Sequence, residues 1–113
     1  MRESRYDEQA YLFVLSALEY TQSRLDARRH ISAAELAGSC RDLAIERFGL
    51  MTRIVLDRWG VRSTADIGEI VFTLVELGFL VKQPNDTREE FADIYDFETA
   101  FEREYPWNSA SSA

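Results

Sequence analysis

The fold is decided by residues 31–80, which read ISAAELAGSCRDLAIERFGLMTRIVLDRWGVRSTADIGEIVFTLVELGFL. This stretch predicts three successive helices, because each has its own start and stop signals. Ser32 and Glu35 have the S-x-x-E spacing of a capping box, in which two side chains satisfy backbone N–H groups at a helix start. Glycines, which tolerate the left-handed backbone at many helix ends, follow each helix: Gly49, Gly60 and Gly78. We therefore expect helices at residues 33–48, 50–59 and 64–77.

Apolar residues in these helices recur at three- and four-residue steps, as they do along one face of a helix. The clearest pattern lies in the last helix, with Ile67, Ile70, Val71, Leu74 and Val75. Its polar stripe consists of Asp66, Glu69, Thr73 and Glu76. The middle helix has a broad apolar side made of Met51, Ile54, Val55, Leu56 and Trp59. We expect the apolar sides to form the core.

A further helix is expected at residues 7–25, and it is apolar on two faces. One stripe consists of Tyr11, Val14, Leu15, Leu18 and Leu25. The second is a line of aromatic residues spaced by seven, Tyr6, Phe13 and Tyr20. Either this line is covered by the chain's own C-terminal aromatic residues, or it is an interaction surface for a partner. Those C-terminal residues are Phe97, Phe101, Tyr105 and Trp107.

The C-terminal third predicts a small β-hairpin. Residues 79–81 change toward strand character, residues 83–86 carry a turn signal, and side chains alternate over residues 91–97. The expected fold is therefore mainly α with a small C-terminal β-hairpin (α+β), in a single four- to five-helix domain over residues 1–107. Residues 108–113 form a disordered Ser/Ala tail. The order of elements also fits a winged-helix-like outline.

The charge disfavours nucleic acid and membrane surfaces as partners. The chain has 113 residues and a net charge of −7, and residues 86–104 hold eight acidic residues against two arginines. Negative charge repels phosphate groups. In a winged-helix arrangement the last helix would present its acidic stripe to DNA, so we expect no binding of nucleic acid by the protein on its own.

Several features predict a cytoplasmic protein. No apolar run approaches the roughly 20 residues that span a bilayer, and the charged N-terminus lacks the apolar region of a signal peptide. One cysteine, Cys40, forbids an internal disulfide and agrees with a reducing compartment.

The sequence predicts no catalytic, cofactor or metal site. His30 is the single histidine, and Cys40 lies on an apolar stripe with no helix-start charge beside it that would lower its pKa, so we do not expect the two to form a catalytic Cys–His dyad. Two soft ligands are too few for zinc, and the acidic residues after position 86 lack the central glycine of a calcium loop. The five glycines are dispersed and form no phosphate-binding loop.

Arg47 and Arg58 share an unusual setting, since each is flanked by apolar residues and is followed closely by a glycine. One interpretation is structural, with a buried stem and a guanidinium that meets a carboxylate or helix-end carbonyls. The other is that these two positions bind an anion.

A combination of short motifs covers about residues 11–101. It comprises His30-Ile31-Ser32 with Glu35-Leu36, Arg41-Asp42-Leu43-Ala44 with Phe48-Gly49 and Met51, Val55-Leu56 with Trp59-Gly60, Gly68-Glu69-Ile70-Val71-Phe72 with Leu74-Val75, and Asp86-Thr87-Arg88 with Phe91 and Tyr95-Asp96-Phe97. The combination resembles the signature of the Minf-type family of small uncharacterised bacterial proteins. The resemblance implies a cytosolic bacterial protein and brings no activity, cofactor or site with it.

Together these observations favour a non-enzymatic cytosolic module that binds a protein partner or a second copy of itself as a homodimer. One alternative is a winged-helix-like regulator or a subunit of a larger complex. A second alternative is an enzyme whose site cannot be read from the sequence.

Overall fold

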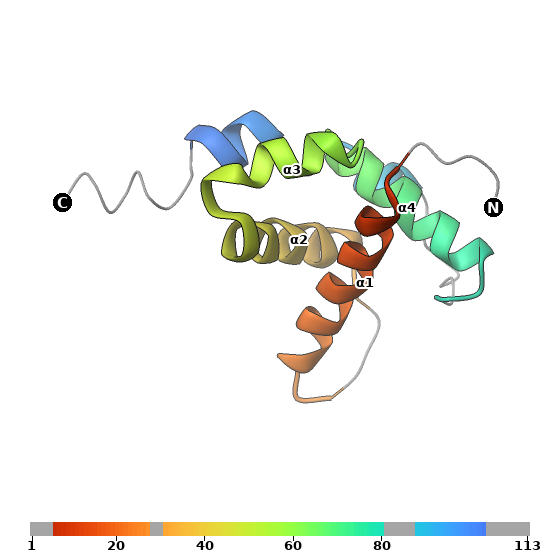
Figure 1. The fold of residues 1–113 in the computed structure, drawn as a ribbon. Helices are drawn as coiled ribbons and strands as arrows, with labels where there is room; N and C mark the ends of the chain where they lie inside the picture. Colours follow the sequence, from red (N-terminus) through yellow and green to blue (C-terminus); the bar gives the residue numbers. More distant parts are fainter. Residues whose placement is uncertain (1–5, 28–30, 81–87, 104–113) are drawn as a thin grey trace.

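The structure is a computed structural model that describes residues 6–27, 31–80 and 88–103. It contains four α-helices, α1 (Glu8–Ser23), α2 (Ala33–Phe48), α3 (Thr52–Arg58) and α4 (Thr64–Glu76). Three short helical turns are η1 (Gly49–Met51), η2 (Arg88–Phe91) and η3 (Thr99–Arg103). In Figure 1, α3 turns back above α2, α1 lies across the start of α2, η2 lies beside α4, and η3 lies beside α3.

The helix starts follow from local capping. Ser32 and Glu35 form the expected capping box, with Glu35 N donating to Ser32 Oγ at 3.1 Å and Ser32 N donating to Glu35 Oε1 at 3.0 Å. Asp7 caps α1, because its Oδ1 accepts from Gln9 N at 2.8 Å. The expectation of helices in all four places is confirmed, and the one expected at residues 50–59 begins as the 3₁₀ turn η1 before α3.

The core lies between α1, α2 and α4. Alanines with no exposed area, Ala17, Ala37 and Ala44, let the helices approach closely. Ile70 and Leu74 of α4 are fully buried, as the helical period predicts. None of the described helices is long and apolar enough to cross a membrane.

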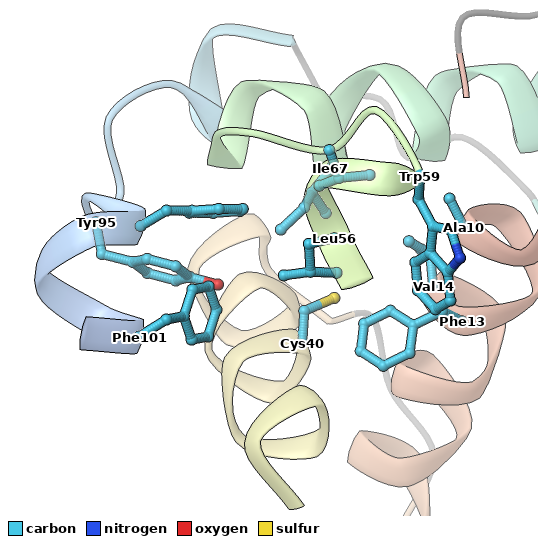
Figure 2. A pocket seen from close by; sticks show the side chains of 11 residues that line it. Ala10, Phe13, Val14, Cys40, Leu56, Trp59, Ile67, Tyr95 and Phe101 are labelled. Atoms are coloured by element: carbon cyan, nitrogen blue, oxygen red, sulfur yellow. The ribbon is translucent and has the colours of Figure 1, made fainter. Parts of the chain in front are cut away.

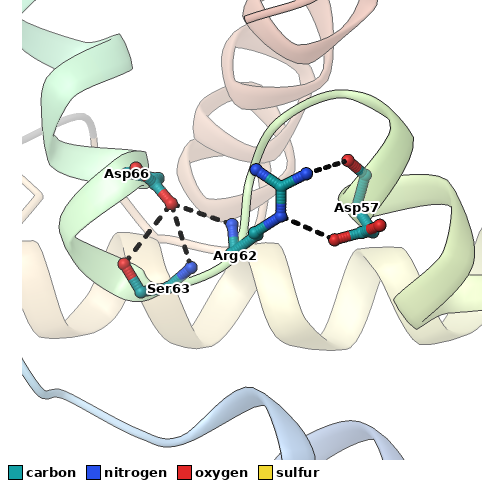
Figure 3. Close-up of polar contacts among 4 residues, drawn as sticks. All are labelled: Asp57, Arg62, Ser63 and Asp66. Atoms are coloured by element: carbon teal, nitrogen blue, oxygen red, sulfur yellow. Dashed lines mark hydrogen bonds and ion pairs between the residues drawn. The ribbon is translucent and has the colours of Figure 1, made fainter. Parts of the chain in front are cut away.

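The start of α1 is held against the corner between α3 and α4. The Tyr6 hydroxyl donates to Asp66 Oδ1 at 2.6 Å, and Asp7 N donates to Trp59 O at 3.0 Å. Figure 3 shows the same Asp66 carboxylate, whose other oxygen accepts from Arg62 N and from Ser63. This one carboxylate therefore joins the chain's N-terminal part to α4.

The predicted C-terminal β-hairpin is not found, because no strand forms in the described parts of the chain. The alternating residues 91–97, expected as its returning strand, instead pass through a turn into the helical residues 97–103. The backbone leaves the extended region at Asp93, where φ is 52°. Backbone N–H groups find side chains rather than a second strand, since Ile94 N donates to Thr64 Oγ1 and Thr99 N to Asp96 Oδ2, both at 3.1 Å.

A winged-helix-like outline therefore has no wing in the described residues. The expected first strand runs into residues 81–87, which lie outside them, as does the expected boundary between a domain ending at 107 and its tail.

Candidate interaction surface at the α2–α3 corner

The corner between α2 and α3 is fixed by one glycine and one buried hydroxyl. Gly49 ends α2 with a φ of 54°, a conformation that favours glycine. Thr52 is 1% exposed, and its hydroxyl lies 2.6 Å from Gly49 O and 3.2 Å from Ala44 O as a shared donor. Because both carbonyls belong to the end of α2, this contact sets the direction in which α3 leaves.

Three large apolar side chains stand exposed on this corner. Leu50 is 71% exposed, and Met51 and Ile54 are each 52% exposed. Met51 and Ile54 are three residues apart, a spacing that makes neighbours at the start of a helix, and Leu50 lies in the 3₁₀ turn that leads into α3. We call Leu50, Met51 and Ile54 the corner surface. Clustered exposed apolar side chains are typical of interaction sites.

The prediction that Met51 and Ile54 belong to the buried side of their helix is wrong. The inward side of α3 is instead taken by Thr52 and Leu56, which are 1% and 4% exposed. A polar residue such as Thr52 does not by itself indicate a buried position. It can be buried here because its hydroxyl donates to the two carbonyls at the end of α2.

Behind the corner lies a cluster of three aromatic rings. Phe13 of α1 has its ring centroid 6.0 Å from that of Phe48 and 5.7 Å from that of Trp59, and the last two are 5.5 Å apart. Aromatic side chains bury large areas and pack with defined geometry. The three rings therefore join α1 to the end of α2 and to the end of α3.

Arg47 and Arg58 lie on either side of the corner surface along the chain. Both are exposed, and neither makes an ion pair within the described residues. The Arg47 guanidinium lies 5.9 Å from the centre of the Phe13 ring, which is a cation–π distance. Arg58 follows Ile54 by four residues and so shares its face of α3. Whether these two positions bind an anion stays a prediction.

The nearest acidic residue on α3 already has a partner. Asp57 Oδ1 accepts from Arg62 Nε at 2.7 Å, and Figure 3 shows this guanidinium folded back toward Asp57. The carboxylate next to Arg58 in the sequence is therefore already paired with another arginine.

The aromatic line Tyr6, Phe13 and Tyr20 does not form one exposed face. Tyr6 is 6% exposed and Phe13 is 5% exposed, whereas Tyr20 is half-buried beneath the Arg24 guanidinium. Phe13 packs against Phe48 and Trp59. Among the C-terminal aromatic residues, Phe97 and Phe101 pack with Tyr95, and Tyr105 and Trp107 lie outside the described residues.

An apolar cavity lies in the core and is too small for a ligand. Figure 2 shows its lining, in which side chains of α1 and of the C-terminal turns face Cys40 and Leu56. Its volume of about 10 Å³ is near the least that holds one water molecule. Burial raises the pKa of the Cys40 thiol from 9.0 to about 12, so the thiol stays protonated and unreactive near neutral pH. His30, the other member of the dyad considered above, lies outside the described residues.

A second concavity, of about 250 Å³, lies at the start of α4 between Arg62 and Asp93. Its polar groups serve the fold, because Thr64 accepts from Ile94 N and Asp96 accepts from Thr99 N. The described residues contain no group of three or more side chains that could hold a metal ion. The corner surface is therefore the best-defined candidate site.

No family model, curated protein or solved structure matches this chain. The resemblance to the Minf-type family stays a prediction.

Proposed function

We propose that this protein is a non-enzymatic interaction module that docks a protein partner on the corner surface. The observation that carries the proposal is the exposure of three large apolar side chains within five residues of the α2–α3 corner, Leu50, Met51 and Ile54. While these side chains are exposed, the protein forgoes the free energy that burial of apolar area provides, about 25 cal/mol per Å². Docking of a partner would recover it.

The contacts that hold the α2–α3 corner favour the same conclusion. A binding surface loses less entropy on association when its backbone and side chains are already held in place. Thr52 fixes the turn, and the Phe13, Phe48 and Trp59 rings fix the helix behind it. The proposal keeps the cytoplasmic setting expected from the sequence, and a second copy of the chain is one candidate partner.

An NMR titration tests the proposal. The ¹⁵N-labelled protein is titrated with synthetic helical peptides that carry three leucines on one face, with either glutamate or lysine on the flanks. We expect shift changes centred on residues 50–58 with at least one peptide. Ile54→Ser should weaken that binding roughly tenfold, the effect of losing about 1.4 kcal/mol of apolar contact.

Leu12 supplies a matched control, because it is an apolar residue of α1 with the same 52% exposure as Ile54. Leu12→Ser should leave peptide binding unchanged. Both variants should retain the wild-type free energy of unfolding within about 0.5 kcal/mol, as surface substitutions do. The proposal would be contradicted if both variants lost binding equally. It would also be contradicted if no peptide shifted residues 50–58 and the protein did not self-associate through Ile54.

A further inference from the structure

We infer that the partner docked on the corner surface is an acidic amphipathic helix, with apolar residues on one face and carboxylates on its flanks. The inference rests on the proposed function and adds the chemistry of the partner to it.

The geometry of the apolar side chains suits a helix. Leu50 and Ile54 are four residues apart, and Met51 lies three residues before Ile54. Partner helices that bind through one face present anchors at matching three- and four-residue steps. A globular interface of standard size uses about 800 Å² and 20–30 residues on each partner. Three apolar side chains fit a helix of a few turns better than a globular face of that size.

The arginines that flank the corner surface along the chain favour an acidic partner. Residues 46–62 hold four arginines and two acidic residues, a local net charge of +2 in a chain whose net charge is −7. One of the two acids, Asp57, is paired with Arg62. Arg47 and Arg58 are exposed without a carboxylate partner among the described residues. Arginine binds carboxylates through two parallel hydrogen bonds, so carboxylates on a partner's flanks match both positions.

The same charge disfavours a symmetric dimer through this surface. A two-fold interface brings the same patch of both copies together. Arg58 follows Ile54 by one helical turn, so two corner surfaces facing each other would bring like charges close, which is unfavourable. An acidic helix avoids this repulsion, and the same arginines then attract it.

The test compares two labelled peptides by fluorescence anisotropy with the full-length protein. The peptides share three leucines on one face and differ only in carrying glutamate or lysine on the flanks. We expect the glutamate peptide to bind roughly tenfold more tightly than the lysine peptide, and to lose affinity as salt is added. Arg58→Glu should reverse or abolish this preference.

Arg24→Glu is the matched control, because it makes the same change of net charge at the far end of α1 (Figure 1). It should leave the preference for the glutamate peptide within about twofold, since exposed charges at this separation are screened. An equal effect of Arg24→Glu would show that net charge, rather than the corner surface, selects the peptide, and would overturn the inference.

Three other outcomes also overturn the inference, and they separate it from the proposed function. Equal binding of both peptides, lost in Ile54→Ser, would remove the acidic selectivity and leave the interaction module standing. Self-association by sedimentation that Ile54→Ser abolishes would make a second copy the occupant, and the module would again stand. Binding of neither peptide, with a monomer at all concentrations, would overturn both. Met51→Ser replaces Ile54→Ser if the latter fails to fold.

Discussion

Two glycines inside helices differ in what lies beside them, and this difference predicts opposite effects of the same substitution. A Cβ atom added at Gly68 would lie 2.7 Å from Phe91 Cβ, whereas one added at Gly38 would meet nothing within 4 Å. Alanine is favoured over glycine in a helix by up to about 1 kcal/mol. We expect Gly38→Ala to stabilise the protein by roughly that amount and Gly68→Ala to destabilise it by about 1–3 kcal/mol through overpacking.

Chemical denaturation of both variants measures this difference. A Gly68→Ala protein that is as stable as Gly38→Ala would show that Phe91 does not pack on α4 as described. The sequence alone could not separate the two glycines, because each simply interrupts a helical pattern. The distinction depends on Phe91, which lies 23 residues further along the chain and reaches Gly68 only through the tertiary fold.

Sequence signals predicted the helix ends correctly where the interactions that form those ends lie within one helical turn. The Ser32–Glu35 capping box and the glycine after α2 predicted Ala33–Phe48, because both act within one turn of the helix ends. The strand expected over residues 91–97 failed because alternation records only that every second side chain is apolar or polar. Phe91 and Phe97 are both buried, but a turn at Asp93 separates them. Phe91 packs beside Gly68 of α4, whereas Phe97 packs with Tyr95 and Phe101.

The C-terminal turns are nevertheless part of the core, which gives a prediction for that element. Phe101 is 7% exposed, and its ring centroid lies 5.0 Å from that of Phe97. Phe101→Ala should lower the free energy of unfolding by about 3–5 kcal/mol, as truncation of a buried phenylalanine does. Phe79→Ala is the control, because Phe79 is 65% exposed and should cost about 0.5 kcal/mol or less. Similar thermal unfolding of the two variants would place residues 97–103 outside the folded unit.

The candidate site was predicted in part, and the reason lies in the whole molecule. Arg47 and Arg58 stood out in the sequence because charges interrupt apolar stripes there. The apolar residues between them did not stand out, since amphipathic patterning in a seven-residue helix cannot say which side faces the core. That choice is made by the packing of α3 on α2, through Thr52 and Leu56, and by the aromatic rings gathered from α1, α2 and α3. The aromatic line of α1 was singled out as one surface, but its members are divided among separate neighbours in the fold.

The charge of the whole molecule gives the last prediction, which is that the protein alone does not bind duplex DNA. Four arginines between residues 46 and 62 supply a local positive charge, but the chain carries a net charge of −7, and non-specific DNA binding depends on the number of phosphates neutralised. Asp66, which would face phosphates in a winged-helix arrangement, is occupied by Tyr6 and by backbone N–H groups. We expect a labelled random duplex to show a Kd above about 100 µM even at low salt. Micromolar binding that weakens steeply with added salt, and that Arg58→Glu reduces, would show instead that the arginines of the corner bind phosphates, and the acidic helix would then be a competitor for a nucleic-acid site.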